Sequence, residues 1–296
     1  MASISGRRAG LLSAHLAAVL FGLSGIFGAL IRFDAFAITL GRAGFASLAL
    51  LCIAVIQRRR LWPAGNRRQI WVLLGSGVLL GWHWVTFFKA LKVGGVGIAT
   101  VGFASFPAFI TLLDVLIWGA NIGRREWALL ALVSLGLVLV TPSFSLGNQA
   151  TAGLAWGIAS GGLFAALALC NRHGARGMNA IQVACWQNLM VCVSIFPLYG
   201  LLGNESVGAV SADLASWFWL ALLGILCTGL AHMLFVRCMN SLDARLAGTI
   251  VALEPVYAIA CAWWLFHEQP STRMLAGAAL IILATVLASR RPGGAA

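Results

Sequence analysis

An acidic residue and a proline stand side by side, as Glu254 and Pro255, inside an apolar segment that begins near Leu246 and ends near Phe266. A carboxylate in lipid costs about 3 kcal/mol or more, so we expect Glu254 to face protein or water. A proline inside a helix leaves a backbone carbonyl free, which is tolerated where neighbours or a cavity satisfy that carbonyl. The two residues together therefore indicate an interior path through a membrane bundle.

The chemistry of Glu254 has three interpretations. The carboxylate could couple transport to protons, pair with a basic side chain, or act as a neutral acid that is hydrogen-bonded to neighbouring groups. The adjacent Pro255 frees backbone groups, which favours a structural hydrogen bond as much as a coupling role. The sequence leaves these alternatives open.

A histidine lies among aromatic residues in the segment Gly-Trp-His-Trp-Val-Thr-Phe-Phe, residues 81–88. A helix places His83 and Phe87 on one face. With three aromatics from other segments, these residues predict an aromatic-lined cavity, which suits flat apolar or cationic solutes. The alternatives are aromatics that face lipid and a buried, hydrogen-bonded structural role for His83. The three further lining residues are Phe106, Phe164 and Tyr257.

Two other polar side chains lie inside apolar segments. Arg42 could extend to the membrane interface, pair with Asp34 or bind a substrate carboxylate, and we favour the structural interpretation. His232 lies one position from residue 231, which follows His83 by 148 residues. We treat Arg42 and His232, together with Glu254 and the two prolines at 107 and 255, as structural or coupling candidates.

Signatures of enzymes are missing from the sequence. It contains no His-Glu-x-x-His, no Gly-x-Ser-x-Gly and no phosphate-binding loop. The seven cysteines lie in or at the ends of apolar segments without metal-binding spacing, so we interpret them as packing residues. We therefore expect no catalytic residue, no metal and no cofactor, and a gradient as the source of any energy.

The composition predicts an all-α integral membrane protein, because 61% of the residues are hydrophobic and only 9% are charged. Apolar runs long enough to cross the hydrocarbon core predict ten transmembrane helices. Their approximate bounds are 9–31, 35–56, 70–90, 96–119, 127–141, 152–170, 180–202, 214–236, 246–266 and 274–289.

The chain also resembles itself at an offset of 148 residues. This shift places Pro107 on Pro255 and Arg125 on Arg273. It predicts two five-helix repeats, residues 1–148 and 149–296. Because five is odd, the second repeat must insert in the opposite direction, and such inverted repeats are typical of transporters with a binding site near the midplane.

Basic residues fall mainly on one side of this arrangement. Fifteen of the 20 Lys and Arg residues lie before the first segment, after the last one, or in loops on that same side. The positive-inside rule then places both termini in the cytoplasm of a bacterial-type inner membrane. The net charge of +12 is thereby explained without nucleic acid.

Glycines recur on two segments that begin the repeats. Gly153, Gly157 and Gly161 fall four apart, which predicts a face that lets another helix approach closely. Gly22 and Gly25 belong to a similar series in the first segment. Close packing with motion and close packing without motion both fit this pattern.

The whole chain resembles the drug/metabolite transporter superfamily, in particular its ten-span EamA-type members. The resemblance rests on the two five-span halves, on Leu-Glu-Pro-Val at 253–256, on Leu-Phe-His-Glu at 265–268, on Gly277, and on the segment from Phe21 to Ser24. In the first half the sequence departs from the pattern, since Phe106 and Ala120 occupy the positions that match Glu254 and Glu268. The histidine and aromatics of residues 81–88 are similar to the aromatic amino acid exporter branch.

The resemblance implies a secondary transporter that exports amino acids, aromatic and other neutral ones above all, and related metabolites by alternating access. It implies a cavity between the first, third, fourth, sixth, eighth and ninth segments, lined by His83, Phe106, Phe164 and Tyr257. We expect a lipid-embedded monomer or weak homodimer with a small-molecule substrate. The alternatives are efflux of lipophilic cations or drugs, and a membrane scaffold or enzyme.

Overall fold

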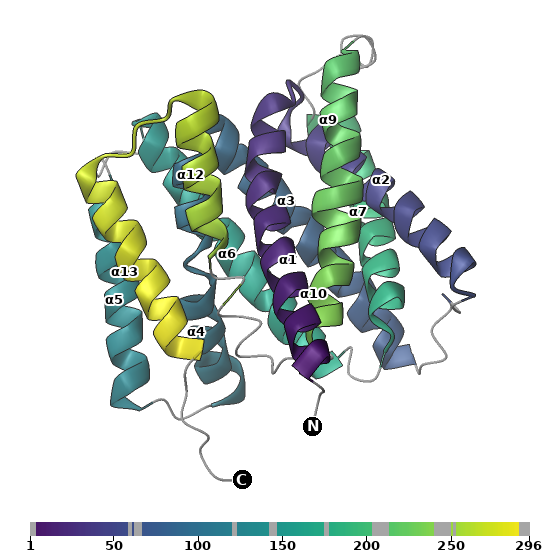
Figure 1. Cartoon of the computed structure of the whole chain (residues 1–296), viewed down its shortest axis with the longest axis horizontal. Coiled ribbons are helices and arrows are strands. Elements are labelled where there is room, and N and C mark those ends of the chain that lie inside the picture. Colours follow the sequence, from purple (N-terminus) through teal and green to yellow (C-terminus); the bar gives the residue numbers. More distant parts are fainter. Residues whose placement is uncertain are drawn as a thin grey trace.

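The computed structural model describes residues 4–58, 61, 67–119, 123–141, 147–174, 178–202, 213–239, 250 and 253–289, and these residues form helices and short connections without strands. The helices stand roughly parallel as one bundle (Figure 1). They are α1 (Ile4–Leu30), α2 (Ala35–Ile56), α3 (Arg67–Phe103), α4 (Phe106–Trp118), α5 (Arg124–Val140), α6 (Gln149–Gly174), α7 (Ala180–Leu202), α9 (Leu214–Gly224), the π-helix η1 (Ile225–Leu230), α10 (Ala231–Met239), α12 (Glu254–Phe266) and α13 (Thr272–Ser289).

Six helical stretches within the described residues are long and apolar enough to cross a membrane. They are Arg8–Leu30, Ala35–Ile56, Arg67–Phe103, Gln149–Asn171, Ile181–Leu201 and Leu214–Leu234. The shorter helices α4, α5, α12 and α13 supply the remaining spans. The predicted fold class, an all-α membrane protein with ten transmembrane helices in two inverted repeats, is confirmed.

The predicted span 96–119 is not one continuous helix. The chain turns at Gly95, whose φ of 84° suits glycine, and then forms the last turns of α3 up to Phe103. Ala104 and Ser105 interrupt the helix, and α4 starts at Phe106. Pro107 therefore lies in the first turn of a new helix, where its missing N–H has no intrahelical partner to lose.

The ninth span, predicted at 246–266, lies within the described residues at 250 and from Leu253 onward, and this later part starts in the same way. Helix α12 begins at Glu254 with Pro255 in its first turn, and both α4 and α12 are 13 residues long. Each ends at a residue in the left-handed region, Gly119 with φ 61° and His267 with φ 54°. The two halves therefore repeat a local geometry at the predicted offset, although a glycine in one half corresponds to a histidine in the other.

Helices α5 and α13 close the two halves against each other. They run antiparallel, since Arg125 at the start of α5 donates a hydrogen bond of 2.6 Å from Nη2 to the carbonyl of Leu287 near the end of α13. Gly136 and Gly277 allow the two backbones to touch. The start of α1 and the end of α13 lie at the same end of the bundle (Figure 1), which we call the terminal face, and the opposite end is the far face.

The predicted glycine face of α6 is where this helix meets α3. A Cβ atom on Gly153 would lie 2.6 Å from the Cα of Gly94, and one on Gly157 would lie 3.1 Å from the Cα of Gly102. Helices this close leave no room for side chains between them. The glycines therefore bring α6 directly against both parts of α3.

Candidate functional site

The side chain of His83 is fixed by a single residue of α6. Its Nδ1 lies 2.8 Å from Oγ of Ser160 and 3.2 Å from the carbonyl oxygen of Ser160. The Ser160 hydroxyl donates its hydrogen to the backbone carbonyl of His83 at 3.0 Å, so Nδ1 must donate to the serine. In the neutral imidazole this leaves Nε2 as a hydrogen-bond acceptor.

Aromatic rings surround this imidazole. Its centroid lies 5.2 Å from that of Phe103, 5.1 Å from that of Phe164 and 6.4 Å from that of Phe87. Phe106 stacks on Phe103 at 5.3 Å and meets Phe164 edge-on at 5.2 Å. We call these five residues the aromatic cluster; the structure brings together four of the five predicted lining residues.

The break between α3 and α4 positions this cluster. Phe103 ends one helix segment and Phe106 begins the next, so both rings project at the interruption. Gly161 of α6 lies against the break, where its Cβ would come within 2.9 Å of Ser105 Oγ. The cluster thus combines a rigid helix contact with backbone that has left the regular helix, a combination found where transporters bind substrates.

Tyr257, the fifth predicted lining residue, lies elsewhere. It packs with a small group of residues from α1 and α10. A Cβ atom added to Gly22 of α1 would lie 3.0 Å from the Cβ of Tyr257. The described structure records no ring contact between Tyr257 and the aromatic cluster. A role for Tyr257 in substrate binding stays a prediction.

Arg42 is buried, with 4% of its surface exposed, and it neither extends to the interface nor pairs with Asp34. Asp34 instead caps α2 by accepting from the N–H of Ala37. The Nε of Arg42 donates to Thr228 Oγ1 at 2.9 Å, and its guanidinium carbon lies 4.0 Å from the centroid of the Trp84 ring. Arg42 therefore points inward, because the π-helix and Trp84 supply partners that the sequence pattern did not reveal.

The two remaining polar candidates border the same region. His232 donates from Nδ1 to the Thr228 carbonyl at 3.2 Å, and its ring meets Phe21 edge-on at 5.7 Å. Glu254 is half-buried at the start of α12, and its carbonyl oxygen faces Gly22 of α1. Gly22 and its neighbour Phe21 thus bring the start of α12 and the ring of His232 to the same part of α1.

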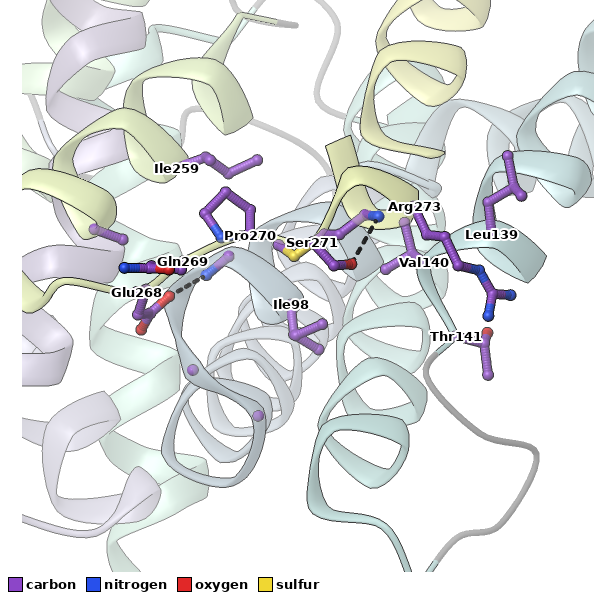
Figure 2. Close-up of a pocket in the computed structure, with 15 residues that line it drawn as sticks. Ile98, Leu139, Val140, Thr141, Ile259, Glu268, Gln269, Pro270, Ser271 and Arg273 are labelled. Carbon is purple, nitrogen blue, oxygen red and sulfur yellow. Dashed lines mark hydrogen bonds between the residues drawn. The ribbon is translucent and has the colours of Figure 1, made fainter. Parts of the chain in front are cut away.

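A cavity of about 660 Å³ opens nearer the far face (Figure 2). Its wall combines the turn at residues 94–98, the end of α5, part of α12 and the connection to α13. Figure 2 shows Arg273 extending toward the end of α5 near Thr141. The second segment of α3 joins this far-face cavity to the aromatic cluster, because Gly95 lies at one of its ends and Phe103 at the other.

One carboxylate ties the wall of the far-face cavity together. Glu268 accepts hydrogen bonds from the backbone N–H groups of Val96 at 3.1 Å and Gly97 at 3.3 Å, and Figure 2 draws the one from Gly97. These N–H groups begin a helical segment, where a negative charge is favoured. Glu268 therefore connects the second half of the chain to the turn of α3 in the first half.

Three contributors to these sites were not singled out in the sequence. Ser160 lies four residues before Phe164, and Phe103 lies three before Phe106, so helical spacing was the available signal for both. Thr228 carried no comparable signal, because a π-helix changes which residues share a face. In the described residues no group of three His, Cys, Asp or Glu side chains is arranged to hold a metal ion.

Comparisons with known proteins identify a family for nearly the whole chain. The EamA-like transporter family matches twice, at residues 8–141 and 151–290. The division of the repeats between residues 148 and 149 stays a prediction, since it falls between these two matches.

Similar proteins extend over most of the chain. An uncharacterized transporter of Archaeoglobus fulgidus is 23% identical over 277 residues, covering 93% of this chain and 94% of its own. The pseudopaline exporter CntI of Pseudomonas aeruginosa strain PAO1 is 25% identical over 240 residues, covering 80% of this chain and 81% of its own. A crystal structure that is 17% identical superimposes with a TM-score of 0.66 over 97% of both chains, which supports the fold.

Proposed function

Because the chain belongs to the EamA-like transporter family, we propose that this multi-pass membrane transporter exports amino acids, aromatic and other neutral ones above all, and related metabolites. A gradient or exchange drives export, and the two halves alternate access to a site between them. A monomer is the proposed working unit, since one chain supplies both halves.

The aromatic cluster carries this proposal. His83 Nε2 accepts a hydrogen bond from a substrate N–H, because Ser160 already occupies Nδ1. The rings of Phe103, Phe106 and Phe164 offer faces and edges to a flat side chain. A site with one polar acceptor among aromatic rings fits a substrate that is apolar except for a few N–H donors.

We place the protein in a bacterial-type inner membrane with the terminal face in the cytoplasm. The distribution of basic residues supports this orientation. The aromatic cluster then takes substrate from the cytoplasmic side, and the far-face cavity forms part of the route outward. We propose that the Glu268 contact with the α3 turn keeps that route closed in this conformation.

Efflux of lipophilic cations is the second candidate, favoured by the aromatic rings alone. The buried guanidinium of Arg42 opposes it, because a second cation nearby would be repelled. The relatives named pseudopaline exporter support a metabolite as the substrate instead.

Resistance of bacterial cells to toxic solutes separates the two candidates. Overproduction of the wild-type protein should raise resistance to p-fluorophenylalanine, an aromatic amino acid analogue, and leave resistance to the cation ethidium unchanged. The control is the His83→Ala variant, present in the membrane at the same level as the wild-type protein. Resistance to ethidium alone would replace the proposal with the cation candidate.

Loss of the Glu268 contact should open the far-face cavity. The variant Glu268→Ala removes both hydrogen bonds to the α3 turn, so we expect a cysteine introduced at Ile98 to react several-fold faster with a membrane-impermeant maleimide. The matched control is Gln269→Ala, which changes a neighbouring cavity residue but leaves the contact in place. Equal labelling rates in the Glu268→Ala and control backgrounds would contradict a closing role for Glu268.

A further inference from the structure

Arg42 is a buried cation in the middle of α2. Two ring systems of α3 cover it, since its guanidinium carbon lies 4.0 Å from the Trp84 centroid and 5.5 Å from the Phe88 centroid. The backbone of Arg42 is also closely packed. A Cβ atom added to Gly224 would lie only 2.7 Å from the carbonyl oxygen of Arg42. The position of this side chain is therefore fixed by packing on both sides.

The guanidinium has more hydrogen-bond donors than its described partner uses. An arginine carries five N–H donors, and within the described residues only Nε has a hydrogen-bond partner, Thr228 Oγ1 at 2.9 Å. Two terminal nitrogens thus remain, in the fork geometry that binds a carboxylate with two parallel hydrogen bonds. A buried charge without such a partner is costly, which points to a ligand that completes the site.

The π-helix explains how Thr228 reaches Arg42. In η1 the Thr228 hydroxyl donates to the carbonyl of Leu223, five residues earlier, at 3.0 Å. The same oxygen accepts from Arg42 Nε. Such π-segments occur frequently at functional sites, and this one orients Arg42 while leaving its terminal nitrogens available.

Glu254 supplies the opposite charge at a distance. Among the described residues the Glu254 and Arg42 side chains do not come within the 4.0 Å of an ion pair. Helix α1 lies beside both α12 and η1, with Gly22 against the Glu254 carbonyl and Phe21 against His232. A fixed cation and a carboxylate that does not pair with it suit a ligand that carries both charges.

We propose that Arg42 and Glu254 form a binding site for the two charged groups of an α-amino acid, with the substrate carboxylate on the Arg42 terminal nitrogens and the substrate ammonium on the Glu254 carboxylate. This inference rests on the proposed export function and narrows its substrates to zwitterions. Helix α3 links the two parts of the site, since Trp84 covers Arg42 while the adjacent His83 belongs to the aromatic cluster. The substrate ammonium has three N–H groups, so it donates both to Glu254 and to His83 Nε2, and the substrate side chain points toward the phenylalanine rings of the cluster.

Three related ligands test this assignment in purified protein. Phenylalanine has both charged groups, 3-phenylpropionate lacks the ammonium, and phenethylamine lacks the carboxylate. Because hydrogen bonds to charged groups contribute most of the discrimination, the wild-type protein should bind phenylalanine about 10- to 100-fold more tightly than either analogue. Isothermal titration calorimetry measures all three affinities.

The variants assign each charge to its residue. In Arg42→Gln, phenylalanine and phenethylamine should bind equally, because the carboxylate has lost its partner. In Glu254→Gln, the preference for phenylalanine over 3-phenylpropionate should fall sharply, because the ammonium keeps only its hydrogen bond to His83. The control Arg125→Gln removes an arginine that contacts Leu287 instead and should keep the wild-type order.

The outcomes distinguish failure of the zwitterion site from failure of the proposed amino acid export. Wild-type protein that binds phenylalanine and phenethylamine equally overturns the zwitterion site and leaves amino acid export standing. Wild-type protein that binds none of the three ligands overturns both. If Arg42→Gln does not fold, the three affinities are measured in Arg42→Lys instead, which keeps the charge but not the forked pair of donors. The comparison of these affinities with those of the wild type then tests the carboxylate site.

Discussion

Replacing His83 by alanine should lower phenylalanine export about 10- to 100-fold, because the variant loses both a hydrogen-bond acceptor and a ring contact in the aromatic cluster. The centroid of the imidazole lies 5.1 Å from that of the Phe164 ring and 5.2 Å from that of the Phe103 ring, so removal of the imidazole leaves a gap among those rings. Transport is measured as export of labelled phenylalanine from cells that contain equal amounts of wild-type and variant protein in the membrane.

Two further variants separate the contributions of His83. In His83→Phe the ring remains but the Nε2 acceptor is lost, and transport should fall nearly as far. In Ser160→Ala the imidazole loses the serine hydroxyl, but the backbone carbonyl at that position still accepts from Nδ1, so a smaller reduction is expected. Unchanged transport in His83→Ala, with normal protein levels, would place His83 outside the substrate path.

Replacing Gly153 by alanine should destabilise the bundle by about 1–3 kcal/mol, because the added methyl group overpacks a contact between two backbones. The new Cβ would lie 2.6 Å from Gly94 Cα and 2.8 Å from Gly94 N, and neither atom can rotate away. The helix α6 must therefore move from the α3 turn. The melting temperature of the purified protein in detergent, followed by circular dichroism, measures the effect.

Gly162→Ala is the matched control on the same helix. A Cβ at Gly162 would meet only the Phe109 ring, at an ordinary distance of 3.9 Å. Alanine favours a helix over glycine, so this variant should be as stable as the wild type or slightly more so. If Gly153→Ala and Gly162→Ala melted at the same temperature, the close contact of α6 with α3 would be contradicted.

The sequence predicted the fold through features that do not depend on tertiary detail. Apolar length predicted the spans, and the offset of 148 residues between Pro107 and Pro255 predicted two helices with matching starts. The sequence did not predict that Phe106 and Glu254 each begin a helix, because a proline inside an apolar run is compatible with a kink as well as with a first turn. Only the described backbone around Ser105 and Leu253 distinguishes the two.

The aromatic part of the site was also predictable, because His83 and Phe87 share a face by helical spacing and Phe106 adjoins a conspicuous proline. The inward course of Arg42 was not predictable. It depends on Thr228, which a π-helix turns toward α2, and on the ring of Trp84. Tyr257 was predicted as a lining residue from its nearness to Glu254 in the sequence; its side chain packs against α1 and α10, and its role in binding stays a prediction.

Counterflow in proteoliposomes tests the central claim, that this family member is an amino acid transporter with a site exposed alternately to the two sides. Vesicles with purified protein are loaded with unlabelled phenylalanine and diluted into a trace of labelled phenylalanine. Alternating access predicts a transient accumulation of label above equilibrium, which needs no knowledge of a coupling ion and is reduced in His83→Ala. Folded wild-type protein that produces no accumulation with phenylalanine or other neutral amino acids would contradict the account.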